Sequence, residues 1–165
     1  MIFNFNAAEV FKIAVEIEEN GKNFYEQSLA CIDDAEVKKL FEELAREEVE
    51  HKRKFQSILA ELPKEATAPT VFDPENKEAE YIKMMADQHV FAKSGSVDSK
   101  VCELNDMRDA LRLAIDFEKD SVIFFLSMQE ATDSKKGKEL ISLLVKEEQE
   151  HLRRLSVELH RVTRK

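Results

Sequence analysis

The sequence predicts an all-α protein in which two helical hairpins form a four-helix bundle. Glycine and proline number only three each in 165 residues, so few residues can break a long helix. Adding one hundred to a residue number aligns the two halves of the chain without a gap. In each half, hydrophobic side chains recur at alternating steps of three and four, as helices packed at a shallow angle require.

Each half is expected to be a helix, a short turn and a second helix. "FKIAVEIEENGKNFY" (11–25) aligns with "LRLAIDFEKDSVIFF" (111–125), and "FEELAREEVEHKRKF" (41–55) aligns with "ISLLVKEEQEHLRRL" (141–155). Short polar residues that can cap a helix precede all four segments. The predicted helix starts are Asn6, Asp33, Asp106 and Asp133.

A long connection over residues 62–104 joins the two hairpins. It contains all three prolines and the "SGS" of residues 94–96, and we expect an extra helix within it at 77–93. A connection of this length lets the third helix start at the same end of the bundle as the second. Residues 1–165 are therefore expected to form a single domain.

Composition and charge exclude several classes of function. The formal net charge of −9 argues against binding to nucleic acid or to an anionic membrane surface. No apolar run approaches the ~18 residues of a membrane span, and "MIFNFNAAEV" does not resemble a signal peptide. Only Cys31 and Cys102 occur, which excludes a cysteine-based metal site and is typical of a reducing compartment. We expect a cytoplasmic protein.

The hydrophobic seam of every helix is interrupted at its middle by polar residues. "EEVEH" (47–51) and "EEQEH" (147–151) each place a Glu and a His three residues apart, on one face of a helix. The other two helices carry a single Glu in the seam. The repeat brings six side chains to one level: Glu18, Glu48, His51, Glu118, Glu148 and His151.

Four carboxylates in a low-dielectric interior would repel one another strongly unless cations balance them. Two divalent cations supply the matching charge, so we predict a two-metal site. Carboxylate and imidazole ligands without thiolate suit iron or manganese, and zinc could also bind. The competing interpretation is a solvated helix face, which the apolar seam disfavours. Surface charge is the interpretation of the off-seam residues Glu47, Glu50, Glu147 and Glu150.

At these residues the chain resembles the ferritin-like di-iron carboxylate superfamily, in particular its rubrerythrin-like branch. The resemblance implies a ferritin-like bundle with two iron ions, one held by Glu18 and His51 and the other by Glu118 and His151. Glu48 and Glu148 would bridge the two ions. Tyr25 matches a family tyrosine that hydrogen-bonds to a ligand carboxylate across the bundle, whereas its repeat partner is Phe125.

Some family features differ in this sequence. Ser121 stands where rubrerythrin has a further Glu, and no rubredoxin module follows the fourth helix. Val49 occupies the position of a haem-ligating Met in bacterioferritin, so we expect no haem.

The resemblance implies an oxidoreductase of the peroxidase or ferroxidase type, which oxidises bound ferrous iron with peroxide or dioxygen. It would act in oxidative stress or iron redox chemistry, with a separate electron donor, and we expect a homodimer. The alternatives are a protein that binds, stores or delivers iron without catalysis, and a structural protein that has lost catalysis.

Overall fold

The computed structural model describes residues 7–62, 104, 106–131 and 135–164. Its long helices are α1 (Ala7–Ser28), α2 (Ala35–Glu61), α6 (Met107–Ala131) and α7 (Lys135–Thr163), with a short 3-10 helix η1 (Leu29–Cys31) after α1. The all-α, four-helix prediction is confirmed over these residues. The extra helix expected at 77–93 and the starts expected at Asn6 and Asp133 lie outside them. None of the described helices combines the length and the hydropathy needed to cross a bilayer.

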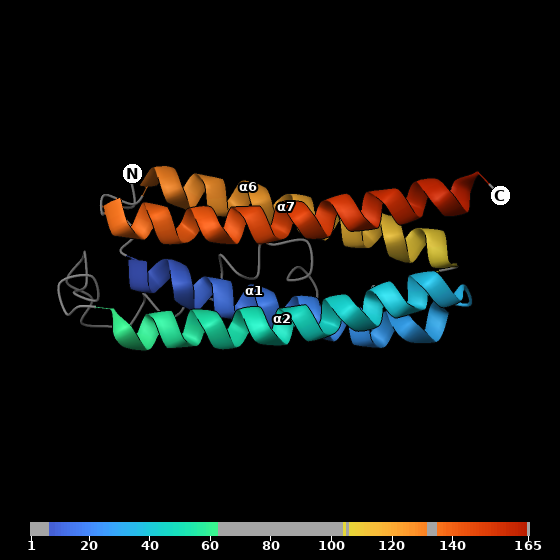
Figure 1. Ribbon diagram of the computed structural model, residues 1–165, viewed down its shortest axis with the longest axis horizontal. Helices are drawn as coiled ribbons and strands as arrows, with labels where there is room; N and C mark the ends of the chain where they lie inside the picture. The colour runs from blue at the N-terminus through green and yellow to red at the C-terminus, as the bar shows by residue number, and fades with distance from the viewer. Residues whose placement is uncertain (1–6, 63–103, 105, 132–134, 165) are drawn as a thin grey trace.

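The four helices form two antiparallel hairpins that lie one against the other along the long axis of the molecule (Figure 1). Each helix packs mainly against its own hairpin partner, α1 against α2 and α6 against α7. Figure 1 also shows that α6 begins at the end of the bundle where α2 begins, as the long connection predicts. The α1 and α7 helices therefore run in one direction, and α2 and α6 run in the other.

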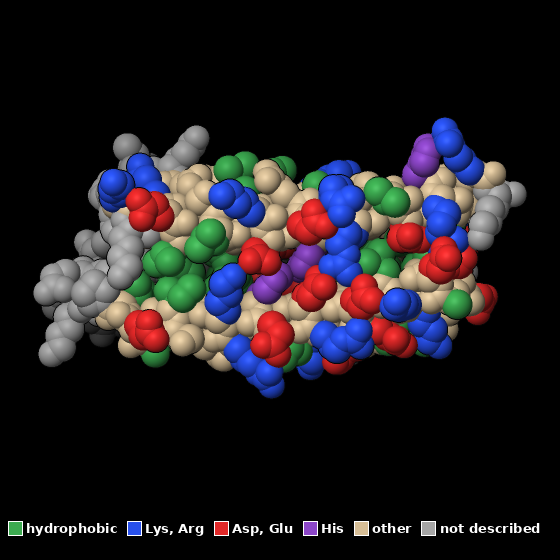
Figure 2. All heavy atoms as spheres, in the orientation of Figure 1, with side chains coloured by type: hydrophobic (Ala, Val, Ile, Leu, Met, Phe, Trp, Pro, Cys, Tyr) green, Lys and Arg blue, Asp and Glu red, His purple; other side chains and the backbone are tan. Residues whose placement is uncertain are grey.

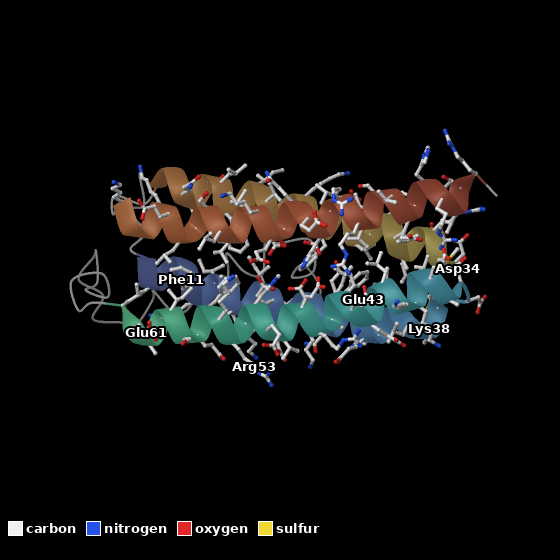
Figure 3. The ribbon with its side chains drawn as sticks, viewed as in Figure 1. Phe11, Asp34, Lys38, Glu43, Arg53 and Glu61 are labelled. Atoms are coloured by element: carbon white, nitrogen blue, oxygen red, sulfur yellow. The ribbon has the colours of Figure 1, made fainter. Side chains whose placement is uncertain are left out.

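The start of α2 differs from the prediction by one residue. The N-cap is Asp34 rather than Asp33, and its carboxylate accepts from the backbone N–H groups of Glu36 and Val37 at 3.0 and 3.1 Å. Arg161 near the end of α7 also donates to this carboxylate at 2.7 Å, at the end of the bundle where Figure 3 labels Asp34. This contact between hairpins favours Asp34 over the adjacent Asp33 as the N-cap. A capping rule that considers only neighbouring residues cannot predict it.

The start of α6 agrees with the prediction. Asp106 lies directly before the helix, and its carboxylate accepts from the backbone N–H groups of Arg108 and Asp109 at 2.8 and 3.0 Å. Because these donors have no partner within the helix, the side chain of Asp106 fixes the residue at which α6 begins.

Aromatic side chains fill the core on both sides of the middle of the bundle. Within the part of the chain that the structure describes, seven of them are almost completely buried: Phe11, Phe24, Tyr25, Phe41, Phe55, Phe117 and Phe125. The core is dense enough around Gly21 of α1 that little room remains for a side chain. A Cβ on Gly21 would lie 2.9 Å from the ring of Phe117 and 3.3 Å from the carboxyl carbon of Glu48.

Replacing Gly21 by Ala is expected to destabilise the protein by about 1–3 kcal/mol, because the added methyl group overpacks a filled core. This outcome is the reverse of the gain of about 1 kcal/mol that alanine brings at an exposed helical position. Urea unfolding followed by circular dichroism measures the difference, with exposed Gln27→Ala in the same helix as the control. A Gly21→Ala protein as stable as the parent would show that Phe117 can move aside.

Candidate metal centre

The structure brings together, at the middle of the bundle, all six side chains that the sequence places at one level. The α1 and α6 helices supply one carboxylate each, whereas α2 and α7 supply one carboxylate and one imidazole each. All six are buried, with exposed fractions of 7% for His51, 2% for His151 and at most 1% for the four glutamates. These residues lie at the centre of a hydrophobic core and not on a solvated helix face. That they bind metal stays a prediction.

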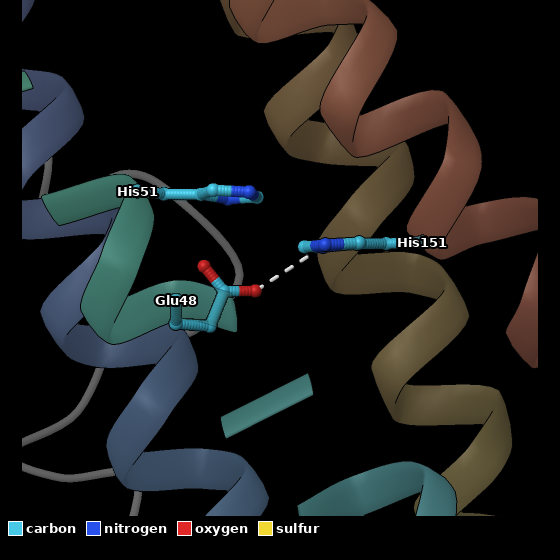
Figure 4. Close-up of side chains that lie close together, drawn as sticks. All are labelled: Glu48, His51 and His151. Carbon is cyan, nitrogen blue, oxygen red and sulfur yellow. Dashed lines mark ion pairs between the residues drawn. The ribbon is translucent and has the colours of Figure 1, made fainter. Parts of the chain in front are cut away.

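The two imidazoles lie parallel, with ring centres 5.1 Å apart and planes 10° apart (Figure 4). Each points its Nδ1 atom at the carboxylates. His151 Nδ1 lies 3.3 Å from Glu48 Oε1 and 3.4 Å from Glu118 Oε1. His51 Nδ1 lies 3.6 Å from Glu18 Oε2. Both rings therefore direct the same nitrogen into the cluster, as two ligands related by an internal two-fold would.

Most of the buried polar atoms in this cluster have no hydrogen-bond partner. The unpartnered atoms include both oxygens of Glu18 and of Glu148, one oxygen each of Glu48 and Glu118, and Nδ1 of both histidines. Leaving such atoms buried without a partner costs free energy, and bound cations remove that cost.

The ligand atoms also converge in sets that suit individual cations. Three sets have one ligand atom per residue within 4.8 Å of one another: Glu18, His51 and Glu148; Glu118, Glu148 and His151; Glu48, His51 and His151. Glu148 joins the first two sets, and Glu48 joins the two histidines. This pattern fits two cations that share Glu48 and Glu148, and the donor set contains oxygen and nitrogen without sulfur.

Burial and mutual repulsion shift the proton affinities of these groups. Desolvation raises the pKa of Glu18 well above its ordinary value, and the charges of Glu48 and Glu148 raise it further. Desolvation and the charge of Glu118 raise the pKa of Glu148 in the same direction. Both shifts show how costly it is to hold these carboxylates charged without cations.

The two imidazoles differ from each other in proton affinity. Desolvation would lower the pKa of His151, but the neighbouring Glu118 charge reverses this and raises it well above the usual range. For His51 desolvation outweighs the nearby charges, and the pKa is lowered. The two halves of the centre are therefore not electrostatically equivalent.

Two glutamates that the sequence suggested were surface charges contact the imidazoles from the opposite hairpin. His51 Nε2 lies 3.1 Å from Glu147 Oε2, and His151 Nε2 lies 3.3 Å from Glu47 Oε2. The side chains of Glu47 and Glu147 are about two-fifths exposed, at 40% and 39%. Figure 2 shows histidine side chains at the middle of one face, flanked by acidic and basic ones. The interpretation as plain surface charge is therefore wrong for these two residues.

The remaining acidic neighbours behave as the sequence suggests. Glu50 and Glu150 are exposed, and each pairs with an arginine three residues later in its own helix, Arg53 and Arg153. The signal that separates Glu47 and Glu147 from them is their place four residues before a histidine that repeats in both halves. This spacing places each glutamate near the imidazole of the opposite hairpin in the packed bundle. The contact cannot be predicted until the packing of the hairpins is known.

Tyr25 donates a hydrogen bond from its hydroxyl group to Glu118 Oε1, which joins α1 to α6. Both residues are completely buried. Desolvation raises the pKa of Tyr25 well above its ordinary value, and the Glu118 charge adds to this, so the phenol remains a donor. The equivalent position in the other half is Phe125, which is also buried and has no hydroxyl group. The two ligand carboxylates Glu18 and Glu118 are thus held differently.

The fold and the cluster define a class of protein, the four-helix bundles that carry carboxylate and histidine ligands at their centre. The family model described as rubrerythrin matches residues 9–159, and the chain belongs to the rubrerythrin family.

A solved structure with the same fold comes from Thermotoga maritima and is described as a ferritin-like diiron-carboxylate protein. It is 21% identical in sequence, the match covers 95% of this chain and 96% of that one, and the TM-score is 0.67. No curated protein matches the chain.

Replacing Glu148 by Ala is expected to lower metal binding from two ions per chain to one or none. Glu148 belongs both to the set with Glu18 and His51 and to the set with Glu118 and His151. Metal analysis after anaerobic loading with ferrous iron and removal of unbound metal measures the stoichiometry. Exposed Glu150→Ala is the matched control and should still bind two ions. Equal stoichiometry in the two variants would contradict the shared role of Glu148.

The metal-free protein is expected to lose stability as pH rises above about 4.5. Burial raises the pKa values of Glu18 and Glu148 well above the ordinary value of 4.5, so these two groups bind more protons in the folded state than in the unfolded state. That contribution is fully present below the unfolded pKa and is lost as pH rises through the folded pKa. The raised pKa of His151 acts in the same direction, and the lowered pKa of His51 acts in the opposite one.

Thermal unfolding in the presence of a chelator, measured between pH 5 and pH 8, tests this expectation. Glu18→Gln removes one titrating carboxylate, so its melting temperature should depend less on pH than that of the parent. A melting temperature of the metal-free parent that rises steadily over this range would contradict the raised pKa values.

Proposed function

We propose that the protein is a di-iron oxidoreductase that oxidises bound ferrous iron with peroxide or dioxygen. The observation that carries this proposal is the convergence of three overlapping sets of buried ligand atoms, most of which have no other partner. Membership of the rubrerythrin family supports it. The likeness to the Thermotoga structure, which is described as a diiron-carboxylate protein, favours iron over manganese or zinc.

In this proposal Glu18 and His51 would hold one ion, Glu118 and His151 would hold the other, and Glu48 and Glu148 would be shared by both ions. Four carboxylate charges would then meet four cationic charges, which would offset the desolvation and the repulsion that raise the pKa values of Glu18 and Glu148. Two ferrous ions in these positions supply the two electrons that reduce one molecule of peroxide.

The chain itself orients the ligands, excludes water and controls protons. The carboxylates are almost completely buried, so bulk water cannot compete for the metal positions. A proton on Nε2 of each imidazole faces Glu47 or Glu147, which leaves the Nδ1 lone pair directed into the cluster. The net charge of −9 attracts ferrous ions to the protein.

The electron donor and the oligomeric state stay predictions. The two cysteines of this sequence cannot build a four-cysteine iron site, so the proposal includes a separate protein or reductant that returns iron to the ferrous state. A homodimer is part of the same proposal.

The test uses metal-free protein loaded anaerobically with two ferrous ions per chain. One equivalent of peroxide should be consumed and both irons oxidised, with an absorption band of oxo-bridged ferric iron. A parallel sample exposed to dioxygen identifies the preferred oxidant, and Glu148→Ala should be inactive with either. A loaded protein that leaves peroxide and dioxygen untouched would exclude the oxidoreductase and favour iron storage or delivery, particularly if it takes up more than two ions per chain.

A further inference from the structure

Three of the pairs of repeat positions that differ between the two halves of the centre favour the same half. The pairs are Tyr25 and Phe125, Glu43 and Leu143, and Lys54 and Arg154. Tyr25 donates to Glu118, Glu43 accepts from Arg154, and Lys54 and Arg154 each donate to a glutamate that faces an imidazole. Together they decide how firmly each set of ligands is held before a cation arrives.

The glutamate that faces His151 is held by an arginine with a second anchor. Arg154 donates from one guanidinium nitrogen to Glu47 and from the other to Glu43 Oε2 at 2.9 Å. Its side chain is only 21% exposed, and Figure 3 shows Glu43 on the side of α2 that faces α7. With both acceptors on α2, the planar guanidinium fixes Glu47, and Glu47 in turn fixes the imidazole of His151.

The glutamate that faces His51 is held less firmly. Lys54 donates to Glu147 Oε1 at 2.9 Å, but its side chain is 45% exposed. The residue equivalent to Glu43 is Leu143, which cannot accept a hydrogen bond and is 44% exposed. A mobile ammonium group with one acceptor restrains Glu147, and therefore His51, less than the guanidinium restrains Glu47.

The ligand carboxylates differ in the same sense. Tyr25 donates to Glu118 Oε1, so Glu118 is oriented in advance. Neither oxygen of Glu18 has a hydrogen-bond partner among the described residues, and the position equivalent to Tyr25 is Phe125. A ligand that is already oriented loses less conformational freedom when a cation binds.

We propose that the two metal positions fill in order, with the first divalent cation at Glu118 and His151 and the second at Glu18 and His51. Glu47 and Arg154 are positioning residues for the first position. This inference rests on the proposal that the six residues bind two cations. The first position is better oriented in advance, and the second cation also enters beside an existing positive charge.

Cobalt(II) is the probe, because its absorption and its anomalous X-ray scattering report binding without any turnover. Anaerobic titration of metal-free protein should resolve two steps whose dissociation constants differ by about tenfold or more. A crystal grown with one equivalent of cobalt should show anomalous density between Glu118 and His151. Density at Glu18 and His51, or two equal affinities, would overturn the proposed order.

The matched variants Glu47→Gln and Glu147→Gln separate the two halves. Glu47→Gln should weaken the first step by about 10–100-fold, as expected when the partner of a ligating histidine is removed, whereas Glu147→Gln should weaken only the second step. Arg154→Lys makes this position match Lys54 and should bring the two affinities closer together. A weaker first step in Glu147→Gln alone would assign the order the other way and overturn the inference.

Circular dichroism of each metal-free variant shows whether it is folded before the titration begins. Failure of this inference can be distinguished from failure of the proposed function. Two cobalt ions bound with equal affinity would remove the order but keep the two-metal centre. No cobalt bound to the folded parent protein would remove both.

Discussion

Repulsion among four carboxylates buried at one level of the bundle is the constraint on which the rest of the structure depends. Glu18, Glu48, Glu118 and Glu148 are at most 1% exposed, and most of their oxygens have no donor. A hydrophobic core would be more stable with leucine at these positions. Cations would complete the core, because the free energy of metal binding would then contribute to the free energy of folding.

The two hairpins support the centre jointly. Each imidazole sits on one hairpin and faces a glutamate on the other, and Tyr25 of the first hairpin donates to Glu118 of the second. Backbone contacts between the hairpins are few compared with those inside each hairpin. The polar contacts around the centre therefore add to the shared hydrophobic core in joining the hairpins, and a metal-loaded centre would strengthen that arrangement.

Most of the fold and the candidate ligands could be predicted from the sequence because both depend on short-range periodicity. The three-residue spacing of Glu48 and His51 holds in any helix, and the repeat places Glu148 and His151 opposite them. Capping by Asp106 is also local, and the structure confirms it. Such features need only the geometry of one helix and the symmetry of the repeat.

The features that the sequence did not predict all depend on contacts between hairpins. Asp34 and not Asp33 caps α2 because Arg161 arrives from α7. Glu47 and Glu147 are off the hydrophobic seam of their own helices, and only the packed bundle shows that each reaches an imidazole across it. These contacts join residues about 100 or more positions apart, and periodicity within a helix carries no information about them.

The covalent link between the hairpins has a consequence for chemistry at the centre. A dimer of identical hairpins related by a two-fold axis must carry the same residue on both sides, so its two ions would have the same surroundings. In a single chain, Tyr25 can stand on one side and Phe125 on the other. Joining the hairpins therefore allows the two proposed metal positions to have different surroundings, so that one position would keep its ion while the other would exchange it.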